Sequence, residues 1–321
     1  MFRALRVTDG TPRLTTDATD DQLGDGDVTI DVEFSSINYK DGMALGGVGG
    51  VLRGDHVIPG IDLVGTVSAS DSPDVAVGDR VLVNGCGLGE SHSGGLAEKA
   101  RVPADWLVPV PDAFTSSQAA AIGTAGYTAM LAVLELERGG VEGDVIVTGA
   151  SGGVGSVAVA LLSALGFRVT ASTGRAEESD WLRSLGADEI LDRASLSEPG
   201  RPLQSQRWSG AVDSVGGPTL ANVIAQLRYG GTAAACGLAA SPELTTALVP
   251  FLLRATRLIG INSVNTPRPL RLEAWQRLGR DLDPAVLDSL SETIGLEQAI
   301  ERAGAILDGG VRGRTVVDVR A

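Results

Sequence analysis

The sequence predicts an α/β protein with two domains, an all-β barrel-like unit and a doubly wound parallel sheet. The chain has 321 residues, which is long for one compact domain. Short β-branched segments broken by turn residues fill its first third, and from Val145 onward strands alternate with helices. We expect residues 1–122 and 264–321 to form the first domain and residues 123–263 to form the second.

The first domain is predicted to consist mainly of short strands. The opening segment, MFRALRVTDG, has the character of a strand and lacks the long apolar core of a signal peptide. Gly-Asp, Pro-Gly and Ser-Pro pairs mark turns between the segments that follow. We therefore expect strands at residues 27–32, 65–67 and 79–83, and a helix that begins near Ser117, where alanine becomes frequent.

The second domain is predicted to repeat a strand–helix unit with right-handed crossovers. Strands are expected at residues 145–148, 168–172, 189–191, 211–215, 231–235 and 258–261, and helices at 156–166, 179–185 and 219–227. Two helices, at 270–278 and 296–307, then precede a last strand at 314–319 that we expect to return to the first domain.

Charge and composition exclude several classes of partner. The formal net charge of −14 argues against nucleic acid or an anionic membrane as the main partner. No run of about 18 apolar residues occurs, so no membrane span is predicted. Because a secretion signal is also lacking, we expect a cytoplasmic protein in which Cys86 and Cys236 are two reduced, buried thiols.

The strongest motif is the glycine-rich segment from Gly149 to Gly155, which follows an apolar strand and opens a helix. Its glycines allow a tight turn and a close approach of the backbone to a pyrophosphate. The helix N-terminus then offers free N–H groups to that anion. We therefore predict a dinucleotide site whose turn contributes Ser151, Gly152, Gly153 and Val154.

The end of the next strand indicates which dinucleotide binds. Enzymes that use NAD place an acid there, about 20 residues beyond the fingerprint, for the ribose hydroxyls. This chain has Ser172, Thr173, Gly174 and Arg175 instead. Hydroxyls and a guanidinium suit a 2′-phosphate, so the predicted cofactor is NADPH; the alternative is that Arg175 is a solvated turn residue.

With these motifs the chain resembles the medium-chain dehydrogenase/reductase superfamily, and within it the acrylyl-CoA reductase family, close to the quinone oxidoreductases. The resemblance runs nearly end to end. It is carried by the segments SSINYKD at 35–41, IPGIDLVGTV at 58–67, GGLAE at 94–98, IGTAGYTAML at 122–131, VTGASGGVG at 147–155, AACGLA at 234–239, PFLLR at 250–254 and GRTVV at 313–317. It implies a GroES-like catalytic domain and a Rossmann cofactor domain, with the active site in the cleft between them.

The resemblance also bears on metal. Zinc alcohol dehydrogenases of this superfamily carry His-Glu after the Pro-Gly pair that is Pro59-Gly60 here, whereas this chain has Ile61-Asp62. Its only histidines are His56 and His92, and a catalytic zinc site needs about three protein ligands. We therefore predict no metal, so that hydrogen-bond donors must polarise the substrate carbonyl.

The implied reaction is hydride transfer from NADPH to the β-carbon of an α,β-unsaturated acyl thioester such as acrylyl-CoA, with a proton added at the α-carbon. The resemblance implies that Tyr39 lies at the nicotinamide, where it would orient the cofactor, donate to the developing oxyanion or supply the proton. The alternative is a core aromatic with a satisfied hydroxyl. Asn38, Lys40 and Asp41 are either its supporting partners or the surface of a turn.

Further contacts are expected on weaker grounds. Thr124 and Arg314 match positions near the nicotinamide, while Leu238 and Ser263 follow predicted strands at the cofactor edge. Two residues carry two readings each: Arg193 is an adenosine contact or an exposed loop residue, and His92 borders the substrate cleft or only shapes its loop. Arg53 is a candidate for a CoA phosphate.

Two alternative functions stay open. A quinone oxidoreductase or general enone reductase would share the fold, the NADPH site and the lack of zinc. A non-catalytic NADPH-binding protein is the alternative from another class, although the complete fingerprint and the Tyr39 region argue against it. The resemblance also implies a homodimer, formed through the sheet edges of the Rossmann domains.

Overall fold

A computed structural model describes residues 1–54 and 57–321. His56, one of the two histidines weighed as metal ligands above, lies outside the described residues. The chain divides into two compact units. Met1–Thr124 and Ser263–Ala321 form unit 1, and Ala125–Asn262 form unit 2. These boundaries lie within two residues of those expected from the sequence.

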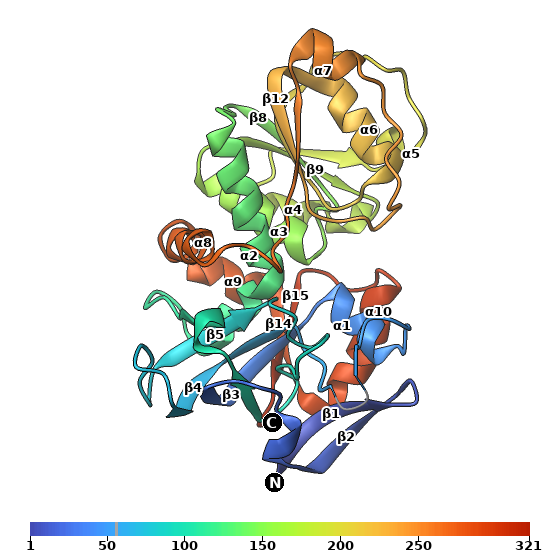
Figure 1. The fold of residues 1–321 in the computed structure, drawn as a ribbon. Coiled ribbons are helices and arrows are strands. Elements are labelled where there is room, and N and C mark those ends of the chain that lie inside the picture. Colours follow the sequence, from blue (N-terminus) through green and yellow to red (C-terminus); the bar gives the residue numbers. More distant parts are fainter. Residues whose placement is uncertain (55–56) are drawn as a thin grey trace. The chain divides into compact units, whose positions relative to one another are not determined.

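Unit 1 is built on a seven-stranded sheet, most of which can be followed in Figure 1. Its strands run in the order β14 (Ser291–Gly295), β15 (Arg314–Asp318), β3 (Val28–Ile37), β4 (Asp62–Ser70), β5 (Arg80–Asn84) and β7 (Val108–Pro109), and β6 (Lys99–Val102) also pairs with β3. The hairpin of β1 (Phe2–Thr8) and β2 (Thr11–Ala18) forms a separate sheet. As predicted, the last strand returns to the first domain, since β15 pairs antiparallel with β3.

Buried aliphatic side chains from these strands fill the core of unit 1. Ile30 and Val32 of β3 lie beside Leu63 of β4, and Val317 of β15 joins the same cluster. The alternation of buried and half-buried residues along β3 matches the period of a strand with one face on a core. Such a sheet gives fixed positions to the residues at its strand ends.

The helices of unit 1 are α1 (Tyr39–Leu45), α8 (Arg268–Asp281), α9 (Pro284–Leu290) and α10 (Ala299–Leu307), with short 3₁₀ turns at Asp20–Gln22, Ala104–Trp106 and Leu296–Gln298. Helices α8 and α10 were predicted from the sequence, whereas α1 and α9 were not. Helix α1 packs beside α10 (Figure 1). It was missed because it has only seven residues, including Gly42, and is too short to show a helical period.

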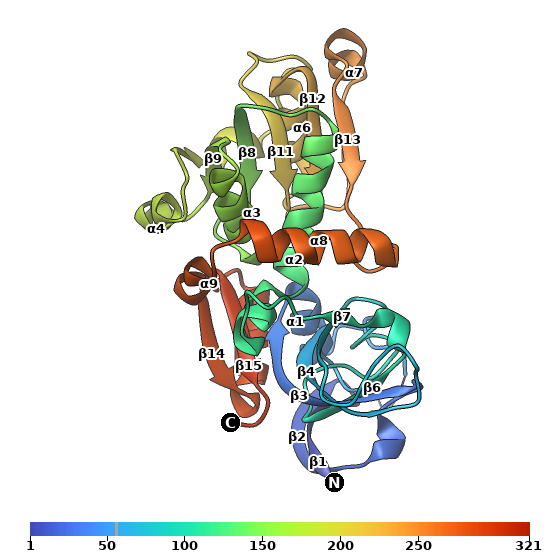
Figure 2. The same cartoon turned by 90° about the vertical axis from the view of Figure 1, so that its left-hand side faces the viewer.

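Unit 2 is a six-stranded parallel sheet in the order β10-β9-β8-β11-β12-β13, most of which can be followed across Figure 2. The strands are β8 (Asp144–Thr148), β9 (Arg168–Thr173), β10 (Glu189–Asp192), β11 (Trp208–Asp213), β12 (Leu227–Ala235) and β13 (Arg257–Gly260). Because β8 is the first strand of the unit, the order reverses between β8 and β11, where doubly wound sheets bind ligands. The predicted doubly wound sheet is confirmed.

Five helices cover this sheet: α3 (Gly153–Ala164), α4 (Ser179–Ser184), α5 (Ala194–Ser197), α6 (Gly217–Gln226) and α7 (Val249–Arg254), with a 3₁₀ turn at Ala176–Glu178. Helix α3 begins three residues before the predicted position at Ser156. Two of the three residues missed are glycines. Because glycine has a low helix propensity, the start of the helix could not be predicted from the residue types there.

Helix α2 (Ser116–Arg138) carries the chain from unit 1 into unit 2. Gly123 interrupts its helical geometry with φ 47° and ψ −159°, so the helix is kinked there. By length and composition α2 could cross a membrane, but 89% of its most apolar window is buried inside the protein. A buried core helix accounts for that composition.

Candidate functional site

The glycine-rich turn lies where the fingerprint predicts, between β8 and α3. A Cβ atom on Gly155 would lie 2.3 Å from the Gly149 carbonyl oxygen, so only glycine permits this close approach of helix to turn. Gly152 is the N-cap of α3, and Gly153 and Val154 are its first residues. Their N–H groups belong to the set that a helix leaves without intrahelical partners, which is where a phosphate binds.

Hydrogen bonds join this turn to the end of β9. The Ala150 N–H donates to the Ser172 carbonyl at 3.1 Å, and the hydroxyls of Ser151 and Thr173 share a bond of 2.6 Å. The Arg175 guanidinium donates to the Ser151 carbonyl at 3.2 Å. The two segments predicted to bind the cofactor therefore form one continuous surface.

Arg193 joins the same surface from the end of β10. Its N–H donates to the Thr173 carbonyl at 2.9 Å. Its side chain passes over Gly174, because a Cβ atom there would lie 2.2 Å from the Arg193 Nε. Two guanidinium groups thus lie at the end of β9, on a protein whose net charge is −14. An alanine at position 174 would displace one of them.

The ends of β8 and β11 are tied together by Asp213, which the sequence reading did not single out. The Thr148 hydroxyl donates to its carboxylate at 2.6 Å, and the Gly216 N–H donates at 2.8 Å. Burial raises the pKa of the Asp213 carboxyl. Leu238 lies beyond β12 and is 63% exposed, with its Cα 3.4 Å from the position that a Cβ on Gly216 would take.

In unit 1, Tyr39 is the first residue of α1 and Asn38 is its N-cap. The Tyr39 side chain is 55% exposed, so the alternative of a core aromatic is wrong. The start of the helix is fixed by Asp41, whose carboxylate accepts the Asn38 backbone N–H at 2.9 Å and the Ile61 N–H at 2.9 Å. Asp41 is fully buried, so the reading in which it is only the surface of a turn is wrong.

A buried carboxylate, Asp62, lies at the centre of a polar cluster next to this helix start. It accepts hydrogen bonds from Asn38 Nδ2 at 2.8 Å, Ser36 Oγ at 2.6 Å, Asn84 Nδ2 at 2.7 Å and Thr124 Oγ1 at 2.6 Å. The Thr124 backbone N–H adds a contact of 2.9 Å to each carboxylate oxygen. Five donor groups thus converge on one side chain that is 1% exposed.

Arg314 completes this cluster from β15. It is 3% exposed, and its Nη2 lies 3.8 Å from Asp62 Oδ2. Its guanidinium donates to the Ala121 carbonyl at 2.8 Å, to Asn38 Oδ1 at 3.0 Å and to Ser36 Oγ at 2.8 Å. The structure therefore brings Thr124 and Arg314, both predicted site residues, into contact with the cluster that caps the Tyr39 helix.

Two carboxylates and one guanidinium share this buried space. Burial and, after it, the charge of Asp62 raise the pKa of Asp41 to about 6. Burial lowers the pKa of Arg314, against the opposing effect of Asp62 and Asp41. From the sequence, Asp62 was recognised only as part of the Ile61-Asp62 pair that replaces the His-Glu of zinc enzymes. Its signal was an acid inside the apolar segment from 58 to 67, since a buried acid requires partners.

Other candidate residues have structural contacts of their own. Lys40 forms an ion pair of 2.8 Å with Glu90, whose carbonyl accepts the Arg53 N–H. The ring nitrogens of His92 lie 2.7 Å from the Asp25 carbonyl and 3.0 Å from the Ser93 carbonyl, which supports the reading in which His92 shapes its loop. Ser263 accepts a bond of 3.2 Å from Arg271 through its carbonyl.

The cysteines differ in part from expectation. Cys86 and Cys236 are both free thiols, as predicted. However, both are half-buried rather than fully buried. Burial raises the pKa of Cys86, and burial together with Asp213 raises the pKa of Cys236 to about 12. Neither thiol has the lowered pKa of a catalytic nucleophile.

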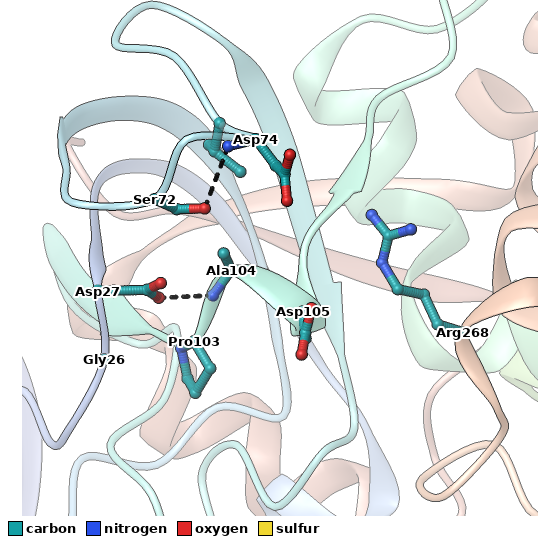
Figure 3. Close-up of a pocket in the computed structure, with 9 residues that line it drawn as sticks. Gly26, Asp27, Ser72, Asp74, Pro103, Ala104, Asp105 and Arg268 are labelled. Carbon is teal, nitrogen blue, oxygen red and sulfur yellow. Dashed lines mark hydrogen bonds between the residues drawn. The ribbon is translucent and has the colours of Figure 1, made fainter.

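A surface pocket of about 670 Å³ lies elsewhere in unit 1, and none of the predicted site residues lines it. Asp27, Asp74 and Asp105 face it together with Arg268, which lies across from Asp27 (Figure 3). The Asp27 carboxylate already accepts the Ala104 N–H at 2.7 Å. This pocket is acidic and separate from the glycine-rich turn, so it is not a candidate for the dinucleotide.

Comparison with known proteins agrees with the two kinds of domain that were predicted. Residues 24–112 match the family described as "Alcohol dehydrogenase GroES-like domain", and residues 153–279 match the family described as "Zinc-binding dehydrogenase". The chain is 50% identical over 301 residues to the "Probable acrylyl-CoA reductase AcuI" of Escherichia coli, a match that covers 93% of each chain.

Solved structures give the same result. The yhdH oxidoreductase from Salmonella enterica in complex with NADP has a TM-score of 0.96 at 48% identity, covering 99% of this chain and all of that one. The Bacillus subtilis protein yhfP with NAD bound has a TM-score of 0.95 at 40% identity, covering 99% of each chain. The fold of this chain is therefore shared with proteins that bind either dinucleotide.

Proposed function

Because this chain belongs to the acrylyl-CoA reductase family of the medium-chain dehydrogenase/reductase superfamily, we propose that it is an NADPH-dependent reductase of α,β-unsaturated acyl thioesters, with acrylyl-CoA as substrate. The observation that carries the proposal is the pair of Arg175 and Arg193 side chains at the end of β9, beside the glycine-rich turn and the buried, mutually bonded hydroxyls of Ser151 and Thr173. Two guanidiniums there suit the 2′-phosphate that distinguishes NADPH from NADH.

The residues between β8 and α3, together with those at the end of β9, fit a dinucleotide. Gly155 leaves the space that a Cβ would fill, and the start of α3 offers N–H groups to the pyrophosphate. Gly152, Gly153 and Val154 hold that part of the cofactor in the proposal, while Ser172 and Gly174 complete the ribose side. When bound, NADPH supplies a hydride to the β-carbon of the thioester.

In unit 1 the proposal assigns the main role to Tyr39. Its exposed side chain meets the nicotinamide or the substrate and donates from its hydroxyl to the thioester oxygen as negative charge develops there. Asn38 cannot take this role, because its amide N–H groups already donate to Asp41 and Asp62. Thr124, Leu238 and Ser263 remain as proposed contacts of the nicotinamide end of the cofactor. Arg314 was expected there too, but its guanidinium is buried and donates to groups of unit 1, so in the proposal it supports the Asp62 cluster instead.

We also propose that no metal takes part, although one matching family is described as zinc-binding. Ile61 has no ligating atom, and both oxygens of Asp62 are occupied by hydrogen-bond donors. Within residues 1–54 and 57–321, no three His, Cys, Asp or Glu side chains gather as metal ligands would. The hydroxyl of Tyr39 then takes the place of a Lewis acid in the proposed mechanism.

We further propose that the protein is a cytoplasmic homodimer without nucleic acid or membrane partners. Its free thiols suit a reducing compartment, and its net charge of −14 opposes binding to polyanions. Strand β13 is an edge of the unit 2 sheet. The neighbouring α7 exposes Leu252 and Leu253, so this edge is the proposed dimer contact.

NADPH oxidation under anaerobic conditions tests the function, with acrylyl-CoA, crotonyl-CoA, methyl vinyl ketone and a quinone compared side by side. The proposal predicts the highest kcat/KM for acrylyl-CoA and propanoyl-CoA as its product. Preference for the quinone would replace it with an NADPH quinone oxidoreductase, and NADPH binding without turnover of any of the four would favour a non-catalytic protein.

A further inference from the structure

The carboxylate of Asp62 joins four parts of unit 1 at one point. Its donors come from Ser36 near the end of β3, from Asn38 at the cap of α1, from Asn84 at the end of β5 and from Thr124 next to the kink of α2. Both oxygens are surrounded by donors. A charged acceptor makes each such bond stronger than a bond between neutral groups, so this carboxylate holds the four segments together.

Asn38 connects Asp62 to Tyr39. Its amide nitrogen donates to Asp62 at 2.8 Å and to Asp41 at 3.1 Å, which uses both of its hydrogens. Its Oδ1 accepts from Arg314 at 3.0 Å. The side chain is therefore held on three sides, and Tyr39 is the next residue along the chain.

Helix α1 depends on this attachment for its position. A helix of seven residues has little stability of its own, so packing and capping at its ends decide where its first residue lies. Tyr39 is 55% exposed, and its ring consequently depends on the backbone at position 39 rather than on a surrounding core.

We propose that Asp62 is a positioning residue for the reaction, which orients Tyr39 through Asn38. The inference rests on the proposed function. Misplacement of a group by about 1 Å is enough to lower a rate about 100-fold. In this proposal the hydrogen bonds of Asp62 fix the start of α1. Tyr39 then faces the substrate from the position that they set.

The test compares Asn38→Ser with Asn222→Ser. Serine still caps a helix but lacks the amide that donates to Asp62 and Asp41. Asn222 is the matched control in unit 2, because its amide nitrogen also donates two bonds, to the Leu196 and Glu198 carbonyls, and its amide oxygen accepts one, from Gln204. The inference predicts a 10- to 100-fold loss of kcat for Asn38→Ser, with an unchanged Kd for NADPH, and no such loss for Asn222→Ser at a comparable fall in Tm.

A second readout does not need turnover. The chain has three tyrosines, so 3-fluorotyrosine labelling introduces three ¹⁹F probes, and Tyr39→Phe assigns the Tyr39 signal by its loss. The Tyr39 signal should shift or broaden in Asn38→Ser and in Asp62→Asn, and stay unchanged in Asn222→Ser. An unmoved Tyr39 signal, or kcat loss that only follows Tm in both serine variants, overturns the inference. A wild-type protein that turns over no thioester overturns the proposed function instead, while the ¹⁹F comparison still decides the role of Asp62.

Discussion

At the scale of single residues, cofactor choice depends on the guanidinium of Arg175. It is held against the glycine-rich turn by its bond to the Ser151 carbonyl, and Arg193 lies across Gly174 on the same surface. A positive edge of this kind compensates locally for the acidity of the whole chain. Selectivity for NADPH over NADH is therefore expected to reside in this edge rather than in the turn itself.

Arg175→Asp should raise the KM for NADPH by about 10- to 100-fold, because it removes a charge-assisted bond of about 1.5–3 kcal/mol and places a carboxylate near the phosphate. The KM for NADH should change little. Steady-state kinetics with each cofactor measure the difference, and Arg183→Asp on the exposed end of α4 is the control. Equal effects on both cofactors would contradict the assignment.

The buried carboxyl of Asp41 makes a specific contribution to pH dependence. Its pKa is raised from 3.8 to about 6 in the folded protein. Between those values the folded state binds more protons than the unfolded state, so this group lowers stability as the pH rises from about 4 to about 6. A difference of about 2 pH units amounts to a cost on the order of 3 kcal/mol above pH 6.

Asp41→Asn should therefore flatten the change of Tm between pH 4.5 and 7, even though it also loses a hydrogen bond from Asn38 or Ile61. Calorimetry at a series of pH values measures this. Asp213, whose pKa is also raised by burial, is present in both proteins, so the difference between them isolates Asp41. A variant whose Tm follows the wild-type pH profile would show that Asp41 does not titrate in this range.

At the scale of elements, the kink of α2 is what brings Thr124 to Asp62. Gly123 has φ 47° and ψ −159°, a conformation almost restricted to glycine. A Cβ there would also lie 2.5 Å from Arg314 Nη2 and 2.6 Å from Asp62 Oδ2. The position therefore requires glycine both for its backbone and for its surroundings.

Gly123→Ala should destabilise unit 1 by at least the 1–3 kcal/mol that such a backbone conformation costs, measured by chemical denaturation. Gly304→Ala is the opposite control: its site in α10 is exposed and open, so alanine should stabilise the protein by about 0.5–1 kcal/mol. Loss of stability at both positions, or at neither, would contradict this explanation.

Elements with a local sequence pattern were predicted well. Features that depend on contacts between residues far apart in the sequence were predicted poorly. Strands of unit 2 and the fingerprint turn are local patterns, so 145–148 and the glycines after it were placed correctly. Helix α1 has no period to detect, and the partners of Asp62 lie 22 to 62 residues away from it along the chain. Only folding brings such donors together, although Tyr39 and Arg314 had been identified separately by resemblance.

At the scale of the whole molecule, association is expected through unit 2. Leu248, Leu252 and Leu253 are 72%, 76% and 65% exposed beside the edge strand β13. Leu252→Glu should shift the protein from dimer to monomer in sedimentation at micromolar concentration, because it places a charge in an apolar contact. Val77→Glu, at an apolar position of unit 1 that is 66% exposed, should leave the dimer intact; a monomeric wild type would contradict the proposed assembly.

The most direct test of the proposed reaction follows the hydride itself. NADPH carrying deuterium on both faces of C4 is mixed with acrylyl-CoA, and the product is analysed by mass spectrometry and NMR. One deuterium at C3 of propanoyl-CoA, on the former β-carbon, is the predicted result, with a solvent-derived proton at C2. Product without deuterium, or oxidation of the labelled NADPH by a quinone but not by the thioester, would contradict it.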